Sequence, residues 1–255
     1  MPKVINLQKN WMKKIGKILF IYVVFGICFA NAIEIKVGIA KQVPFTFYNE
    51  KTKKYVGFNV DILSKIFSDF DFEYTFIPID IEDLVPKLKG KKIDIIASYV
   101  PLNDKKFVYT EPYYSGGYGI FVVEGNNAIT TFNDLMDKKV GVISDSEGNK
   151  IANNNTDKIG QIVEFNNYDG LFKALKANQI DATIDFIDTF NYFVESAKLN
   201  VKNVGEIINI QDMQFILNDK FLAKRIDKEI KVLKIKRWYH KIYEKWFNAI
   251  IDEDI

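Results

Sequence analysis

The stretch Leu88-Lys89-Gly90-Lys91-Lys92-Ile93-Asp94-Ile95-Ile96-Ala97-Ser98 has a second copy downstream, Leu175-Lys176-Ala177-Asn178-Gln179-Ile180-Asp181-Ala182-Thr183-Ile184-Asp185. Leu, Lys, Ile and Asp recur at the same spacing in both copies. Each copy is typical of the end of an amphipathic helix, a tight turn and a short apolar strand. An internal repeat of this kind indicates two α/β units of related design.

Each copy also follows a similar earlier strand. Val37-Gly38-Ile39-Ala40 precedes the first copy, and Val140-Gly141-Val142-Ile143 precedes the second. Strands that alternate with helices imply parallel sheets with right-handed crossovers, in which ligands gather at the carboxyl ends of the strands. Two such units leave a cleft between them, where small molecules bind. We therefore expect binding residues in the segments that follow Ala40, Ser98, Ile143 and Ile184.

The hydrophobic pattern predicts the individual elements. Strands are expected at residues 34–40, 72–77, 93–99, 118–123, 140–143, 161–165 and 180–184, with a weaker strand near Ile207. Helices are expected after Gly57 and at residues 82–89, 147–153, 169–177 and 189–196, with a long amphipathic helical region at 227–247. Asn59 or Asp61 is expected to cap the helix after Gly57, and Thr131 or Asn133 to cap a short helix.

Residues 1–32 have the three parts of a secretory signal peptide. Lys13, Lys14 and Lys17 form a basic start, residues 18–30 are apolar apart from one glycine, and Ala30-Asn31-Ala32 is an A-x-A cleavage site. A membrane-spanning helix needs about 20 residues, so we expect cleavage after Ala32 and export to the periplasm. An uncleaved N-terminal anchor is the alternative. Translation could start at Met1 or at Met12, which puts the lysines at the front.

Charge and cysteine content narrow the class of function. Because residues 1–32 hold five lysines and no acidic residue, removing them turns the net charge of the chain from +2 to −3. That balance gives no indication of nucleic-acid binding, which needs a clustered basic face. Cys28 is the only cysteine and follows Ile27, not the small residue that lipid attachment needs. The mature chain is therefore predicted to have neither a disulfide nor a thiolate metal site.

A further set of short segments carries a family resemblance. They are Pro44-Phe45, Gly57-Phe58-Asn59-Val60-Asp61, Leu84-Val85-Pro86-Lys87-Leu88, Lys92-Ile93-Asp94, Thr110-Glu111-Pro112-Tyr113-Tyr114, Asp134-Leu135, Lys139-Val140-Gly141-Val142, Ala174-Leu175, Ile180-Asp181-Ala182 and Lys241-Ile242-Tyr243-Glu244-Lys245-Trp246-Phe247. In this order they resemble the extracellular solute-binding proteins of family 3, the periplasmic amino-acid-binding components of ABC importers. No single segment is specific, but the ordered set covers nearly all of residues 33–247.

The resemblance implies an α/β protein with the two-lobed, type II-like periplasmic-binding-protein fold and two connecting hinge strands. We expect a signal peptide at residues 1–32, a discontinuous first lobe at 33–123 and 212–255, and a second lobe at 124–211. The implied ligand is an amino acid or a similar small polar solute, captured between the lobes and delivered to an ABC transporter permease in the inner membrane. We expect a monomer that uses no cofactor and binds no nucleic acid.

The chain departs from the family where the ligand's carboxylate is usually held. The family uses an arginine a few residues after the strand that matches residues 93–98, in a two-pronged hydrogen bond. Here Lys105 and Lys106 are the nearest cations. The family's Gly-Thr-Thr-like turn corresponds to Asp145-Ser146-Glu147, in which Ser146 keeps a hydroxyl at a helix start. The added acids favour a neutral or cationic ligand. Solvated lysines and a plain N-cap serine are the structural alternatives.

Asp185 is predicted to pair with the ligand's amino group. The family's acceptor aspartate would fall on Phe186, which Asp185 and Asp188 flank; an exposed strand-end charge is the alternative for Asp185. The candidates for the rest of the site are Ser98 at the end of its strand and the aromatic side chains of Phe45, Phe47, Tyr99 and Tyr114, among which Phe45 and Tyr99 are favoured. Aromatic faces suit a cationic group, although most aromatic side chains belong to protein cores.

The sequence carries no catalytic signature. It has no P-loop, no H-E-x-x-H, no G-x-S-x-G and no metal-spaced cluster, and its only histidine, His240, lies in the C-terminal helical region. We therefore predict a binding protein without catalytic residues or a metal site. Two alternatives stay open: an exported dehydratase for prephenate-like substrates on the same scaffold, and a sensory accessory protein that signals to a receptor.

Overall fold

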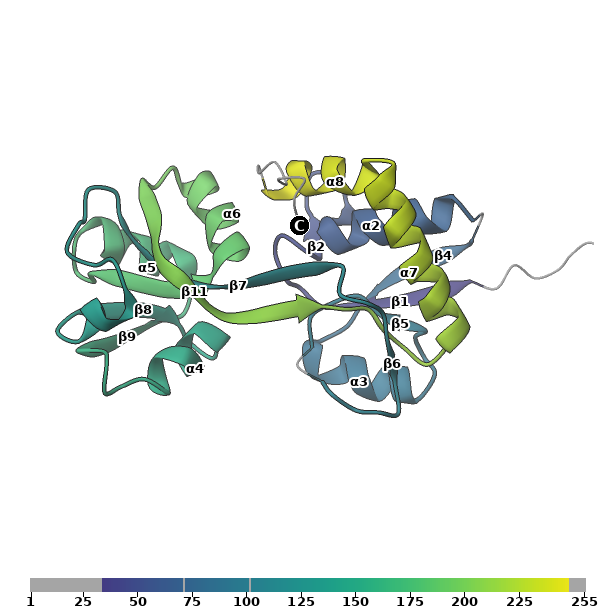
Figure 1. The fold of residues 1–255 in the computed structure, drawn as a ribbon, viewed down its shortest axis with the longest axis horizontal. Helices are drawn as coiled ribbons and strands as arrows, with labels where there is room; N and C mark the ends of the chain where they lie inside the picture. The colour runs from purple at the N-terminus through teal and green to yellow at the C-terminus, as the bar shows by residue number, and fades with distance from the viewer. Residues whose placement is uncertain (1–33, 71, 101, 248–255) are drawn as a thin grey trace, which may run out of the picture.

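Residues 34–70, 72–100 and 102–247 are described by the computed structural model, and they form two lobes (Figure 1). The predicted export signal lies outside this part of the chain. The first lobe holds a five-stranded sheet of order β4-β1-β5-β12-β6 and a hairpin, β2-β3. These strands are β1 (Ile35–Ile39), β2 (Phe47–Asn49), β3 (Lys54–Val56), β4 (Tyr74–Pro78), β5 (Ile95–Ile96), β6 (Val108–Tyr109) and β12 (Ile216–Leu217). The helices of this lobe are α2 (Phe58–Ser68), α3 (Ile81–Lys89), α7 (Lys220–Ile235) and α8 (Trp238–Phe247).

The second lobe is built on a five-stranded sheet of order β11-β7-β10-β8-β9. Its strands are β7 (Tyr114–Val123), β8 (Lys139–Ile143), β9 (Gln161–Phe165), β10 (Ala182–Phe186) and β11 (Val201–Met213). Its helices are the 3-10 helix η1 (Phe132–Leu135), α4 (Glu147–Asn153), α5 (Tyr168–Lys176) and α6 (Ile187–Ala197). Because β8 is parallel to both β9 and β10, the carboxyl ends of these three strands lie at one edge of the sheet.

The sequence repeat makes the same hydrogen bonds in both lobes. In the first lobe, Asp94 accepts from the Lys36 N–H through Oδ2 at 2.8 Å, and the Asp94 N–H donates to the Lys36 carbonyl at 2.8 Å. In the second lobe, Asp181 and Lys139 form the same two bonds, again at 2.8 Å each. These two aspartates therefore have a structural role: each bonds the start of its segment to the first strand of its lobe's parallel sheet.

The packing behind the repeat is also shared. Gly38 of β1 faces Ile93, and a Cβ on this glycine would lie 2.4 Å from the Ile93 Cδ1. Gly141 of β8 faces Ile180 with the same 2.4 Å separation. Both isoleucines are almost fully buried, so each repeat inserts one branched side chain where only glycine leaves room. The two α/β units predicted from the repeat are therefore confirmed in atomic detail.

Two long strands connect the lobes. β7 and β11 form an antiparallel pair whose register runs from Val201 opposite Val123 to Met213 opposite Tyr114 (Figure 1). β7 also pairs with β10, over residues 118–121. The predicted division of the chain into lobes, with a boundary after Val123, stays a prediction.

Some local expectations need correction. The helix α2 begins after Gly57 without a side-chain cap; Asn59, expected as a cap, instead donates from Nδ2 to the Ala97 carbonyl at 2.7 Å. The strand predicted at residues 93–99 is shorter, since only Ile95–Ile96 pair as β5. The long C-terminal helix is broken into α7 and α8 at Arg237, which has a φ of 58°. Thr131 caps η1 as predicted, in a capping box with Asp134.

The shared hydrogen bonds generate a stability prediction. We expect Asp94→Ala and Asp181→Ala each to lower the free energy of unfolding by about 1 kcal/mol, because each removes one solvent-accessible acceptor of a backbone N–H. Asp94→Asn keeps an acceptor oxygen and should lose less than half as much. Urea unfolding followed by circular dichroism measures all three. A loss at only one of the two aspartates would contradict their equivalence.

Candidate ligand-binding site

A cavity of about 450 Å³ lies between the lobes. The first lobe contributes Lys41, Gln42, Val43, Phe45 and Tyr99, all from segments that follow β1 and β5. The strands, loops and helices of the second lobe contribute Tyr118, Ile143, Asn166, Asn167, Tyr168, Asp185, Phe186, Thr189, Phe193, Gln211 and Met213. The site thus lies where the parallel-sheet rule places it, at the carboxyl ends of strands from both lobes.

The wall from the first lobe is held rigidly by side-chain to backbone bonds. Gln42 pairs with the backbone of Tyr99 in both directions: its Nε2 donates to the Tyr99 carbonyl and its Oε1 accepts from the Tyr99 N–H, each at 2.8 Å. Ser98 Oγ accepts from the Ala40 N–H at 2.8 Å, and Thr46 Oγ1 donates to the Ala40 carbonyl. These bonds fix the loop after β1 to the segment after β5.

Asp185 is the carboxylate that faces the cavity from the second lobe. It belongs to β10 and is only 6% exposed. Its Oδ1 accepts from the Phe186 N–H at 2.7 Å, and the Tyr168 hydroxyl lies near enough to lower the pKa of the carboxyl, but Oδ2 has no partner with hydrogen-bond geometry among the described residues. A buried carboxylate oxygen without a partner costs free energy. The arrangement leaves this oxygen available to a donor that enters the cavity.

Burial changes the ionisation of this site. It raises the pKa of Asp185 from 3.8 to about 7, although the Tyr168 hydroxyl and the Phe186 N–H act in the opposite direction. Burial also raises the pKa of Tyr118, and the nearby Asp185 and Glu147 carboxylates raise it further. The tyrosine hydroxyls therefore stay protonated at neutral pH, while the Asp185 carboxyl titrates there.

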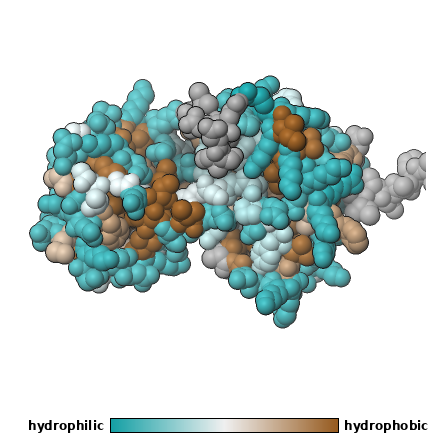
Figure 2. Space-filling view, viewed as in Figure 1, coloured by the Kyte–Doolittle hydropathy of each residue, from teal (hydrophilic) through white to brown (hydrophobic). Residues whose placement is uncertain are grey.

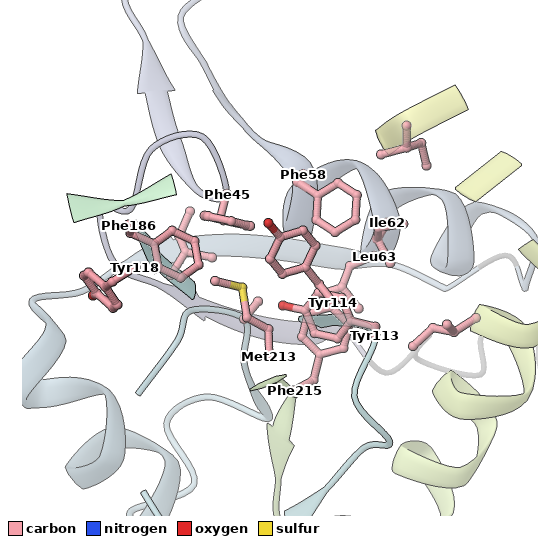
Figure 3. Close-up of a cluster of buried hydrophobic side chains, with 14 of the residues drawn as sticks. Phe45, Phe58, Ile62, Leu63, Tyr113, Tyr114, Tyr118, Phe186, Met213 and Phe215 are labelled. Carbon is pink, nitrogen blue, oxygen red and sulfur yellow. The ribbon is translucent and has the colours of Figure 1, made fainter. Parts of the chain in front are cut away.

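An aromatic cluster forms the floor between the lobes (Figure 3). The Phe45 ring of the first lobe lies 6.0 Å from the Phe186 ring and 5.2 Å from the Tyr114 ring, both in edge-on arrangements. Tyr118 packs edge-on against Phe186 at 5.4 Å. Phe45 is 2% exposed, so it lines the cavity as a packed core side chain.

The lobes also touch along α6. The Thr189 Oγ1 donates to the Val43 carbonyl at 2.8 Å, and this bond joins the start of α6 to the first lobe beside the cavity. Next to it, Tyr114 at the start of β7 donates from its hydroxyl to the Asp188 Oδ2. Asp188, which flanks the predicted acceptor position, is therefore bonded to protein, unlike the free oxygen of Asp185.

The structure brings together only part of the predicted set. Phe45, Tyr99 and Asp185 line the cavity. Lys105 and Lys106 are exposed and are not among the lining residues. Ser146 caps α4, where its Oγ accepts from the Asn149 N–H at 3.1 Å. Ser98 is buried and bonded to Ala40. Ligand contacts by these two lysines and two serines stay predictions.

Several lining residues were missed by the sequence analysis. Asn166, Asn167 and Tyr168 follow β9 directly. The predicted strand at residues 161–165 was correct, but its carboxyl end was not included among the binding segments. Lys41 follows β1, in a segment where the prediction named the aromatic side chains instead. The strand-end rule, applied to every parallel strand, would have found all four residues.

The first lobe also has a hollow that belongs to it alone. This second hollow, of about 600 Å³, lies between the β2–β3 hairpin and the start of α3, and includes Tyr48, Asp80 and Asp83. Hydrophilic side chains cover most of the visible face of both lobes (Figure 2). Within the described ranges, no group of three potential metal ligands was found, and no helix is long and apolar enough to cross a bilayer.

The two-lobed α/β fold and the cavity between its lobes define a solute-binding protein. The sequence profile of the bacterial extracellular solute-binding proteins, family 3, matches residues 35–249. The chain belongs to this family, which confirms the resemblance inferred from the ordered segments.

Relatives with assigned names are binding proteins. A probable histidine-binding protein of Campylobacter jejuni is 29% identical over 172 residues, and the alignment spans 64% of each chain. A putative amino-acid ABC transporter-binding protein of Vibrio harveyi, PatH, is 29% identical over 86% of this chain and 91% of its own. Among solved structures, an ancestral arginine-binding protein bound to arginine is 28% identical, with a TM-score of 0.63 over 84% of this chain and 98% of its own.

The raised pKa of Asp185 predicts a pH-dependent gain in stability for Asp185→Asn. Between pH 4 and 7 the unfolded carboxyl ionises while the folded one keeps its proton, so the wild type loses stability as pH rises through this window. The amide side chain of the variant Asp185→Asn cannot ionise, so the variant does not lose stability in this way. Its stability relative to wild type should therefore increase by roughly 1–3 kcal/mol from pH 5 to pH 8.

Urea unfolding at the two pH values measures this difference. Glu164→Gln, an exposed change on β9, is the matched control and should show no such trend. An Asp185→Asn effect that is the same at both pH values would show that this carboxyl has an ordinary pKa.

Proposed function

We propose that this protein is a periplasmic substrate-binding protein that captures an amino acid in the cavity between its lobes and delivers it to an ABC transporter permease. Family membership and the names of the relatives support this role. The single observation that carries the amino-acid assignment is the free Oδ2 of the buried Asp185. An ammonium group is the donor best able to offset the burial of that carboxylate.

The lining of the cavity favours a ligand with a cationic or aromatic side chain. Tyr99, Tyr118 and Phe193 contribute ring surface, and aromatic faces attract cations. Glu147 raises the pKa of the Tyr99 and Tyr118 hydroxyls and so lies near the site, where its carboxylate is paired with Lys150. The relatives named for histidine and arginine binding agree with this class.

The proposed function also includes export of the protein and a membrane partner. The signal at residues 1–32, cleaved after Ala32, would deliver the protein to the periplasm, where it would act as a monomer on a permease of the inner membrane. The relatives named as periplasmic or ABC transporter-binding proteins support this location and this partner. We propose binding rather than catalysis, because the named relatives are binding proteins.

Isothermal titration calorimetry with the twenty amino acids tests this function. We expect at least one amino acid to bind with a Kd in the micromolar range or below. Asp185→Asn should weaken that binding by at least about 30-fold, because it removes one partner of a buried charge pair. Glu164→Gln should bind as the wild type does. Turnover of prephenate, or the absence of binding by any amino acid, would contradict the proposal.

The same titration should depend on pH. Since the free protein holds a proton on Asp185 below about pH 7, an ammonium ligand must displace that proton at pH 6. The affinity should therefore fall about tenfold from pH 8 to pH 6. The residual binding of Asp185→Asn should lack this dependence. Equal pH profiles for the two proteins would assign the titration to another group.

A further inference from the structure

Of the described residues that line the cavity, Lys41 carries the only positive charge and Asp185 the only negative one. They come from different lobes: Lys41 follows β1 of the first sheet, and Asp185 lies in β10 of the second. An α-amino acid carries one group of each sign. The cavity therefore offers one complementary charge on each side.

We propose that Lys41 supplies the cation that holds the ligand's carboxylate, in place of the arginine that the family resemblance led us to expect after β5. This inference rests on the proposed capture of an amino acid. It replaces Lys105 and Lys106: all three lysines are exposed, but only Lys41 lines the cavity.

The backbone on both sides of Lys41 is fixed toward the cavity. Ala40 is bonded to Ser98, and Gln42 is bonded to Tyr99 through two hydrogen bonds of 2.8 Å. The Gln42 N–H also donates to the Thr46 carbonyl at 2.7 Å. Lys41 is thus the free side chain between two anchored neighbours. In this way Ser98 and Tyr99, both predicted site residues, position Lys41.

The Lys41 ammonium group has no partner in the part of the chain that the structure describes. It forms no hydrogen bond or ion pair with the described residues, although Glu50, Asp80 and Asp83 line the adjacent hollow that Lys41 also borders. A lysine ammonium is a mobile point charge on a four-carbon stem. It can therefore reach a carboxylate in the cavity without first breaking an internal salt bridge.

The charge balance of the cavity requires such a cation for an acid ligand. Asp185 faces the cavity, and Glu147, which affects Tyr99 and Tyr118, is paired with Lys150 at 3.1 Å. Without Lys41 the charged side chain left among the described lining residues is Asp185, which repels a carboxylate when it is ionised. With Lys41, ligands that carry a carboxylate should bind better than the corresponding amines.

Matched ligand pairs test this assignment by calorimetry on the purified protein: L-histidine with histamine, L-arginine with agmatine, and L-lysine with cadaverine. We expect Lys41→Gln to weaken amino-acid binding at least about tenfold and amine binding less than twofold. Lys41→Arg should keep most of the amino-acid affinity, since it restores the charge. Lys105→Gln, a matched exposed lysine, should leave both unchanged.

The outcomes separate this inference from the proposed function. In one outcome the wild type binds an amino acid, and Lys41→Gln binds it equally well or loses affinity for the amino acid and the amine by the same factor. Lys41 is then not the carboxylate partner, although the protein is an amino-acid binder. If the wild type binds none of the three amino acids but binds the amines, the cavity takes a cation without a carboxylate, and the role of Lys41 is overturned. If it binds none of the six, the inference falls together with the assigned ligand class.

Discussion

The antiparallel pairing of β7 with β11 is the contact on which the two-lobed arrangement depends. These strands carry the chain from the first sheet to the second and back, and their pairing extends from Tyr114 to Val123 on one side. The register shifts between Val204 and Ile208 and between Ile208 and Gln211. Such bulges bend a strand pair and increase its twist. The crossing pair therefore sets how the carboxyl ends of the two parallel sheets face one another, and so where a cavity forms.

The cavity is organised around a charge that the protein itself leaves incompletely satisfied. Asp185 is buried, has one oxygen without a partner and titrates near neutral pH. Burial of this kind lowers stability unless a partner arrives. Loss of stability at a binding site is typical, because residues that serve function often stabilise the folded protein less than core residues do. In our proposal the ligand's ammonium group is the missing partner, and Lys41 on the opposite lobe receives the carboxylate.

Much of the fold could be predicted because the repeat combines local and long-range constraints. Each copy depends on a few single residues: a glycine that faces an isoleucine, and an aspartate that bonds to the first strand. Because these residues recur at the same spacing, both copies are recognisable in the sequence. The site was harder. Asp185 could be predicted from its place at a strand end. The backbone hydrogen bonds of Ser98 and Gln42 could not, because their partners lie 58 and 57 residues away in the chain. Lys41 was overlooked because a lysine in a loop has no local pattern that distinguishes a cavity from solvent.

A crystal structure of the protein grown with an amino acid that binds it would locate the ligand. We expect the ligand between the lobes, with its amino nitrogen within hydrogen-bond distance, about 3 Å, of the Asp185 carboxylate. Its carboxylate should face the first lobe at Lys41. A ligand bound instead in the hollow beside Tyr48 and Asp80, or oriented with its amino group away from Asp185, would show that Asp185 and Lys41 do not form the binding site.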